Sequence, residues 1–322
     1  MKGWAEGLEL IELVRAAHRA GWLERLRDDM SAAELASVTG VSAEQVSNVL
    51  AVLVSAGVVQ DGEKSFRLSP AFDALVAGAS GVDVSTVLGG VELARAQVAQ
   101  AVRPTGQQRR PDGEQALRLA RDWGVRATPG ARQLYGMLYE TLGDYRDRLE
   151  QGGPLLDVGS GVGGALLTTL TLFDGLRAVG VETVPEVAAE LGRRARDAGV
   201  ADRVDVRTAD ARVLRDESIF TVSYWAQVFF PAEARADTLA AIFRALRPDG
   251  LLLVQELFPP ESGPEEPSTR TRLDRLFYRQ QHIAWGMSAE DLAAEGHAAG
   301  FRDTRIVASP LGRLVVMRKP AG

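Results

Sequence analysis

Apolar and polar residues alternate along the first third of the chain with the periods of helices and one strand pair. Within residues 8–26 apolar positions recur at spacings of three and four, which predicts an amphipathic helix. Ser31 and Ser42 each precede a further apolar-periodic segment, and we expect both to be helix N-caps. Asp61-Gly62 then lies between two short apolar runs, which is a hairpin signal. Helix, turn, helix and hairpin in this order predict a winged helix.

The second helix of this predicted winged helix carries no cation. Residues 43–57 contain no Lys or Arg, although a helix that enters the major groove of DNA needs contacts to phosphates. Its apolar face instead predicts a core or an interface through Val46, Leu50 and Leu53. We therefore expect residues 1–78 to form a structural domain without a nucleic-acid partner.

Residues 79–150 are predicted to form a mostly helical connector. Two prolines and two glycines make 104–114 an exposed loop. Further on, Tyr135 and Tyr139 fall on one helical face together with two leucines, in a segment that reads as one helix. This stripe is either ordinary core packing or part of a lid whose tyrosines line a ligand pocket.

Between residues 151 and 322 the pattern changes to short strands that alternate with helices. Short apolar runs typical of buried strands are separated by amphipathic segments typical of helices. This alternation predicts a parallel sheet covered by helices on both faces. A hairpin through 310–312 closes the chain. Ligands of such sheets bind beyond the carboxyl ends of the strands, where the strand order reverses. We expect the functional site at those strand ends.

A loop rich in glycine follows the first strand of this region. The segment reads LLDVGSGVGG and ends at Gly164. Such a loop lets the backbone approach a ligand closely while the N-terminus of a helix faces it. Gly159, Gly161 and Gly164 also fit the dinucleotide pattern G-x-G-x-x-G. Asp157 favours another ligand, because a carboxylate there repels a pyrophosphate and attracts a cationic, zwitterionic molecule such as S-adenosylmethionine.

Acidic residues end three consecutive strands of this region. They are Asp157, Glu182 and Asp210. One carboxylate offers two acceptor oxygens, so Glu182 suits both hydroxyls of a ribose. Asp210 would accept from the adenine amine, and Asp157 would bind the ammonium group of the methionine chain, directly or through water. Turns are polar in general, but three such acids beside one glycine loop favour a ligand site.

Composition excludes several other classes of protein. The net charge of −6 argues against a nucleic-acid partner. The absence of cysteine excludes disulfides and thiolate metal sites, and with three histidines we expect no metal site. The N-terminus lacks a signal-peptide pattern, and no apolar run approaches the roughly 20 residues that cross a bilayer. We expect a cytoplasmic protein without a membrane partner.

Four motifs together resemble the small-molecule O-methyltransferases of plants and of bacterial natural-product pathways. They are SAAELASVTGVSAEQVSNVLAVLVSAGVV, LLDVGSGVGG, RPDG with LLLVQE, and SAEDLAAEGHAAGF, and the resemblance covers nearly the whole chain. It implies an α/β fold with a class I methyltransferase domain, Rossmann-like with a mostly parallel seven-stranded sheet, over residues 151–322. It also implies a helical or winged-helix domain over residues 1–78 that forms a homodimer, with the active site between the two domains.

The resemblance carries over cofactor contacts as well. S-adenosylmethionine is the implied cofactor, and Gly159, Gly161, Glu182 and Asp210 match its contacts. With their neighbours at the strand ends, the predicted cofactor-binding residues are Asp157, Gly159, Gly161, Gly163, Glu182, Asp210, Ala211, Ser223 and Tyr224. The predicted substrate pocket consists of Tyr135, Tyr139, Trp225, Gln227, Phe229, Phe230, Gln281 and Trp285.

The chain departs from this family at the catalytic base. Many members follow the fourth strand with a His-Asp pair whose histidine removes the proton of the acceptor hydroxyl, whereas Phe229 and Phe230 stand here. His282 is the histidine that could reach the pocket, and Tyr224 is the second catalytic candidate. The alternative is transfer by alignment alone, because the sulfonium of the donor is already activated.

Three functions follow from these patterns. The leading one is methylation of a small natural-product-type molecule at oxygen, nitrogen or carbon. The second keeps the fold and the ligand, but the methionine chain cyclises internally and releases methylthioadenosine, or the cofactor assists a rearrangement. The third and weakest is a regulator that binds a small molecule and DNA through the winged helix.

Overall fold

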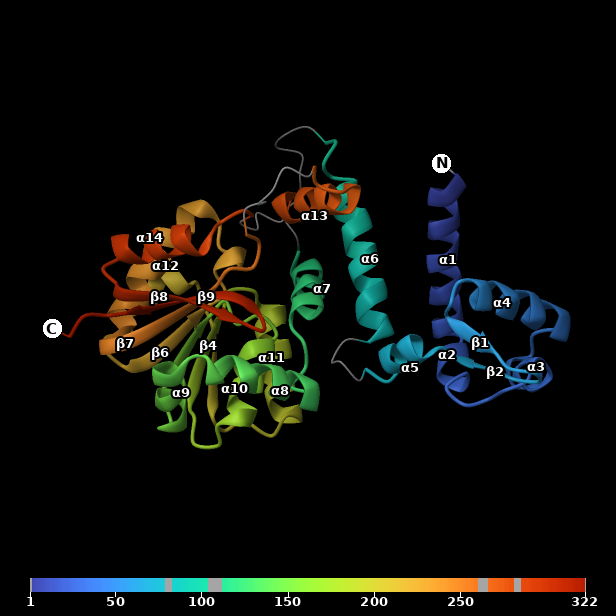
Figure 1. Ribbon diagram of the computed structural model, residues 1–322, viewed down its shortest axis with the longest axis horizontal. Coiled ribbons are helices and arrows are strands. Elements are labelled where there is room, and N and C mark those ends of the chain that lie inside the picture. The colour runs from blue at the N-terminus through green and yellow to red at the C-terminus, as the bar shows by residue number, and fades with distance from the viewer. Residues whose placement is uncertain (1, 79–82, 104–111, 260–265, 281–284, 322) are drawn as a thin grey trace. The chain divides into compact units, whose positions relative to one another are not determined.

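Figure 1 shows the computed structural model, which describes residues 2–78, 83–103, 112–259, 266–280 and 285–321. The chain divides into two compact units, Met1–Gly89 and Gly90–Gly322. The expected boundaries after residues 78 and 150 remain a prediction.

The smaller unit is built from short helices and one hairpin. Its elements are α1 (Lys2–Arg19), α2 (Trp22–Arg25), α3 (Ala32–Thr39), α4 (Ala43–Ser55), β1 (Val59–Asp61), β2 (Phe66–Leu68) and α5 (Pro70–Val76), and α6 (Val84–Val98) runs across the boundary between the units. The single helix predicted over 8–26 is wrong. Gly21 adopts a left-handed conformation with φ 72°, which ends α1 and starts α2 in a new direction.

The other local predictions for this unit are confirmed. Ser31 forms a capping box with Glu34, and the Ser42 hydroxyl accepts from the backbone N–H of Gln45. The hairpin is present, with Asp61 paired to Phe66 across its loop. The predicted apolar face of α4 lies in the core of this unit, where Val46, Leu50 and Leu53 are fully buried.

The larger unit contains a seven-stranded, mostly parallel sheet, as expected. Its strands are β3 (Leu155–Val158), β4 (Ala178–Glu182), β5 (Val204–Thr208), β6 (Phe220–Trp225), β7 (Leu246–Gln255), β8 (Arg302–Ser309) and β9 (Gly312–Arg318). They lie in the order β5-β4-β3-β6-β7-β9-β8, and β9 runs antiparallel to both of its neighbours. The order reverses at β3, which pairs with β4 on one side and β6 on the other. That reversal places the loop after β3 where such sheets bind ligands.

Helices cover both faces of the sheet (Figure 1). The helical elements of this unit are α7 (Gly113–Trp123), α8 (Pro129–Glu140), α9 (Gly143–Glu150), α10 (Gly164–Leu172), α11 (Pro185–Asp197), the 3-10 turns η1 (Ala211–Val213) and η2 (Gln227–Phe229), α12 (Ala232–Ala245), α13 (Thr269–Gln280) and α14 (Ala289–Ala298). Side chains of α8, α9 and α10 pack on one face, and those of α12 and α14 pack on the other. Successive strand residues alternate between these two cores, so that Tyr224 and Trp225 point to opposite faces.

Two features of the connector differ from the prediction. The segment expected as one helix over Tyr135 and Tyr139 is broken at Thr141-Leu142, where α8 ends and α9 begins. In addition α7, which starts with a capping box at Asp112, has no counterpart among the predicted elements.

Among the described residues, no single helix is long and apolar enough to cross a membrane. Helices α3 and α4 reach the required length and apolar composition only when they are taken together, and the two are bent by 118° relative to each other.

Candidate active site

The carboxyl ends of β3, β4 and β6 bring the predicted cofactor residues to one edge of the sheet. Asp157 pairs with Gly180 of β4 on one side and with Tyr224 of β6 on the other. Glu182 is the last residue of β4. Parallel strands therefore place residues that are far apart in the sequence beside the glycine loop.

The glycines of this loop differ in what surrounds them. Gly159, Gly161 and Gly163 all have positive φ angles, of 77°, 54° and 84°. A Cβ on Gly161 would meet no atom within 4 Å, so that position borders open space. A Cβ on Gly163 would lie 2.3 Å from Leu191 Cδ1, because α10 starts here against α11. Gly161 is thus the glycine open to a ligand, and Gly163 is required for packing.

Glu182 is tied to the glycine loop. Its Oε2 accepts from the backbone N–H of Gly161 at 3.0 Å, and its Oε1 accepts from the backbone N–H of Val184 at 2.9 Å. Burial raises the pKa of this carboxyl above its usual range, and the two backbone hydrogen bonds oppose that shift. Each oxygen keeps a further lone pair, so the carboxylate can still accept from a ligand.

Asp157 is buried without a counter-charge. The residue is 2% exposed, and its Oδ1 has no hydrogen-bond partner among the described residues. Burial raises its pKa to about 7, and the negative charge of Glu182 acts in the same direction, whereas Ser160 lowers it. An unpaired buried carboxyl oxygen at a predicted ligand site marks a functional position.

A small cavity of about 20 Å³ lies next to Asp157 and has room for one water molecule. Four of the five tyrosines of the chain line it, namely Tyr135, Tyr139, Tyr145 and Tyr224. The other lining residues are Leu138, Leu155, Ala165, Thr169, Leu253, Gln255, Leu311 and Leu314. We call this space the tyrosine cavity. The structure therefore groups the predicted residues Tyr135, Tyr139 and Tyr224 around Asp157.

Three of these tyrosine hydroxyls are hydrogen-bonded within the protein. Tyr139 donates to Thr169 Oγ1 at 2.6 Å, since that oxygen itself donates to Ala165 O. Tyr145 donates to the carbonyl oxygen of Ser223 at 3.2 Å, and Tyr224 donates to Gln255 Oε1 at 3.4 Å. Burial raises the pKa of Tyr139 well above its usual range, which keeps its hydroxyl protonated.

Asp210 and Ser223 already have partners of their own. Asp210 caps η1 by accepting from the backbone N–H of Arg212, and it also forms a two-pronged ion pair with the guanidinium of the same residue. Those hydrogen bonds hold the pKa of Asp210 below its usual value. The next residue, Ala211, is buried in η1. The Ser223 hydroxyl is fully buried and donates to the carbonyl oxygen of Leu156.

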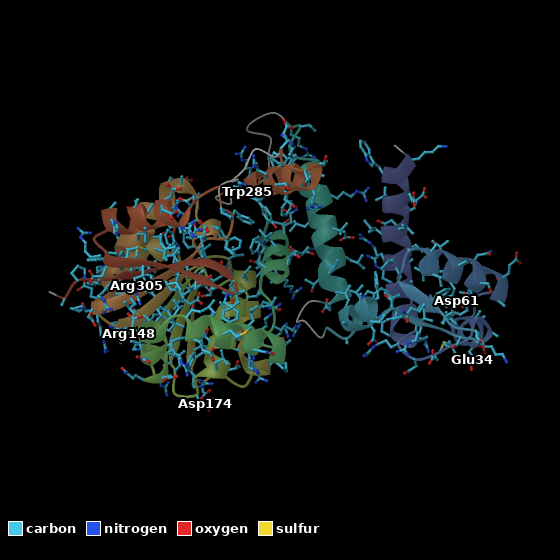
Figure 2. All side chains as sticks on the ribbon, viewed as in Figure 1. Glu34, Asp61, Arg148, Asp174, Trp285 and Arg305 are labelled. Atoms are coloured by element: carbon cyan, nitrogen blue, oxygen red, sulfur yellow. The ribbon has the colours of Figure 1, made fainter. Side chains whose placement is uncertain are left out.

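Phe229 and Trp285, both predicted to line the substrate pocket, join one group of aromatic rings. Trp123 of α7 contacts Phe229 edge-on at 5.4 Å between ring centroids and contacts Phe258 at 5.5 Å. Phe258 stacks on Trp285 at 4.4 Å, and Tyr278 of α13 touches both. Figure 2 shows Trp285 at the α13 end of the larger unit, away from Arg148 and Arg305. We call these five rings the aromatic cluster.

Trp123, Phe258 and Tyr278 were not predicted as site residues. Aromatic residues make up only 6% of the chain, so Trp123, a single ring within the polar segment RDWG, was a usable signal. The helix α7 that carries Trp123 was missing from the prediction. Without that helix, the ring contacts of Trp123 could not be predicted.

Other predicted pocket residues occupy structural positions. Trp225 is 1% exposed and lies in the core, with the Arg235 guanidinium 4.8 Å above its ring. Gln227 is buried, accepts from Arg235 and donates to the carbonyl oxygen of Gln255. The ring of Phe230 packs on Trp225 and leaves no room for a Cβ at Gly159.

The predicted residues Gln281 and His282 lie outside the described residues. The other two histidines lie elsewhere in the fold, where His18 pairs with Glu24 and His297 contacts Thr304. Among the described residues, no group of three or more His, Asp or Glu side chains could hold a metal ion.

Comparison with known proteins places this site in context. Residues 155–250, which include β3, the glycine loop and Glu182, match the family model described as a methyltransferase domain. No curated protein sequence matches the chain.

Solved structures match almost the whole chain. Mitomycin 7-O-methyltransferase is 20% identical, with 99% of this chain and 96% of that chain covered and a TM-score of 0.71. An O-methyltransferase family protein from Burkholderia thailandensis is 13% identical over 99% and 97%, with a TM-score of 0.75. Human N-acetylserotonin methyltransferase, solved with S-adenosylmethionine, is 17% identical over 99% and 96%, with a TM-score of 0.68. The chain therefore carries a methyltransferase domain at residues 155–250 and has the class I methyltransferase fold of the O-methyltransferases.

Proposed function

We propose that this protein transfers a methyl group from S-adenosylmethionine to a small natural-product-type molecule. The proposal depends on three features that lie together at the carboxyl ends of neighbouring strands. These are the orphaned carboxyl oxygen of Asp157, the open face of Gly161 and the carboxylate of Glu182. The match to a methyltransferase domain and the fold of the relatives support it.

The residues present fit this cofactor. Asp157 offers a carboxyl oxygen without a partner to the ammonium group of the methionine chain. Gly161 has no side chain, so the open space beside its backbone is available to a ligand. Glu182 has acceptor capacity for the ribose hydroxyls, and Asp210 with Ala211 would contact the adenine once the exposed Arg212 pair opens. When bound, S-adenosylmethionine supplies a methyl group that its positive sulfur already activates.

The aromatic cluster is the proposed binding surface for the acceptor. Its five rings present flat apolar faces and edges, which favour a planar aromatic molecule. Phe229, at the position of the family's histidine, is 37% exposed and holds no proton-accepting atom. The residues of the site would then accelerate transfer by holding the acceptor in line and excluding water, without an imidazole at this position.

We further propose a homodimer formed through the smaller unit. Trp4 is 79% exposed and Leu8 is 48% exposed, and they lie one helical turn apart on α1. Apolar side chains in such an arrangement favour burial against a second chain.

Product analysis tests the reaction. The purified protein is incubated with S-adenosylmethionine, with and without a set of planar phenols and aromatic amines, and the nucleosides are identified by mass spectrometry. Methyl transfer predicts S-adenosylhomocysteine only where an acceptor is present, together with an acceptor heavier by one methylene. Methylthioadenosine without any acceptor would instead identify internal cyclisation of the methionine chain.

A further inference from the structure

The tyrosine cavity surrounds Asp157 with groups that cannot balance a negative charge. Tyr135 and Tyr139 face it from α8, Tyr145 from α9 and Tyr224 from β6. Among the described residues that line this cavity there is no Lys, Arg or His. Helix α10 contributes the neutral residues Ala165 and Thr169.

A neighbouring carboxyl group makes ionisation of Asp157 harder. Glu182, on the neighbouring strand β4, is itself a carboxylate, and its charge disfavours a second one. Three of the four tyrosine hydroxyls are committed elsewhere, since Tyr139 donates to Thr169, Tyr145 to the Ser223 carbonyl oxygen and Tyr224 to Gln255. Among the described residues no hydroxyl, that of Tyr135 included, donates to Asp157 Oδ1. An ionised Asp157 would therefore have an unpaired charge with 2% of the residue exposed, which is strongly unfavourable.

We infer that Asp157 is a neutral acid in the unliganded protein and that it releases its proton to the solvent when the ammonium group of S-adenosylmethionine arrives. The O–H bond of the carboxyl breaks, the proton passes to buffer, and the carboxylate that remains pairs with the ammonium group. The inference rests on the proposed function, because that ligand supplies the positive charge. It assigns to Asp157 a coupling between cofactor binding and pH.

The direction of the pH dependence follows from this coupling. Burial gives Asp157 a pKa of about 7 without ligand, and an adjacent positive charge lowers a carboxyl pKa by about 1–3 units. Below pH 7 binding must therefore displace a proton, and affinity falls by up to about tenfold for each pH unit. Above pH 7 the carboxyl is already ionised, and this contribution levels off.

Isothermal titration calorimetry measures the proton directly. S-adenosylmethionine is titrated into the protein at pH 6 in two buffers that differ in ionisation enthalpy, and the difference in heat gives the protons released. We expect the release of about 0.4 to 0.9 proton per bound ligand for a lowering of the Asp157 pKa by about 1–3 units, since an α-amino group is fully charged at this pH and contributes nothing. Binding without any proton release would overturn the inference.

Two ligands and two variants locate the source of the proton. Methylthioadenosine has no amino-acid chain, so it should bind to the unaltered protein without proton release. Asp157→Asn should bind S-adenosylmethionine more weakly and release no proton, whereas Glu182→Gln should still show proton release. Loss of the proton in Glu182→Gln alone would assign the titration to Glu182 and contradict the inference.

The outcomes separate this inference from the proposed function. If S-adenosylmethionine does not bind at any pH, the proposed function fails. If it binds with an affinity that does not change between pH 6 and 8, the methyltransferase proposal stands and the inference fails. Should Asp157→Asn not fold, the comparison of the two ligands on the unaltered protein still decides.

Discussion

Asp157 is the residue at which the needs of binding and of folding oppose each other. Its folded pKa of about 7 lies above the roughly 3.9 of an unfolded aspartate. The folded protein therefore binds more protons than the unfolded chain between about pH 4 and pH 7, and this group lowers stability as the pH rises through that range. The full shift corresponds to a loss on the order of 4 kcal/mol above pH 7.

Asp157→Asn should consequently be more stable than the natural protein at pH 8. This advantage should shrink as the pH falls from 7 towards 4, because below about pH 4 the Asp157 side chain is neutral in both the folded and the unfolded protein. Thermal unfolding of the two proteins across this range checks the prediction. A variant that is less stable at pH 8 would show that the carboxylate has a favourable partner.

Glu182 differs from Asp157 because both of its carboxyl oxygens accept hydrogen bonds from the backbone. In Glu182→Gln only one side-chain oxygen remains, so either Gly161 or Val184 loses its acceptor. Leaving one such group unpaired should lower the free energy of unfolding by about 1–3 kcal/mol. Weaker contact with the ribose should reduce the affinity for S-adenosylmethionine about tenfold to a hundredfold.

The matched control for Glu182→Gln is Glu140→Gln. Glu140 is exposed at the end of α8, so its change should alter neither denaturant unfolding nor calorimetric binding. Equal effects of both substitutions would contradict the role given to Glu182.

Among the structural elements, the glycine loop offers a test with two neighbouring substitutions. Gly163→Ala forces a Cβ against Leu191 and Leu167 in the core and should cost about 2–4 kcal/mol of stability. Gly161→Ala meets no atom and should cost only about 1 kcal/mol for its positive φ. Gly161→Ala should nevertheless weaken cofactor binding, since its methyl group enters the open space.

Chemical denaturation and calorimetry on both variants check these expectations. If Gly161→Ala binds S-adenosylmethionine as tightly as the natural protein, the loop does not face the ligand. If it destabilises the fold as much as Gly163→Ala, the space beside Gly161 is not open.

Elements with a local chemical signal could be predicted from the sequence. Ser31 and Ser42 cap helices because a side-chain oxygen satisfies a backbone N–H within three residues, which needs no information from the rest of the fold. The break of α1 at Gly21 and of the connector at Leu142 could not be predicted, because the apolar period continues across both. Packing of the following segment decides those boundaries.

In the candidate site, too, some features could be predicted from local sequence and others depend on tertiary packing. Asp157 and Glu182 lie near the carboxyl ends of β3 and β4, Gly161 lies in the loop after β3, and the parallel pairing of the two strands brings the three together. Their other partners depend on tertiary contacts that no pattern reports. Arg212 reaches back to Asp210, Arg235 covers Trp225, and Trp123 joins the aromatic cluster from an unpredicted helix.

For the whole molecule, the homodimer is the proposal with the simplest test. Sedimentation equilibrium should give twice the mass of one chain. Replacing Trp4 and Leu8 together by serine should give a monomer, because these are the exposed apolar side chains of α1. Val213→Ser, which changes an equally prominent apolar residue of the larger unit, should leave the dimer intact. A monomeric natural protein would contradict the proposal.

The sheet edge formed by Asp157, Gly161 and Glu182 is expected to bind S-adenosylmethionine. A calorimetric titration of the purified protein with this ligand at pH 7.5 measures that binding. We expect saturable binding of one molecule per chain, weakened in Glu182→Gln and unchanged in Glu140→Gln. A titration without saturable binding, or binding that both variants leave unchanged, would contradict this expectation.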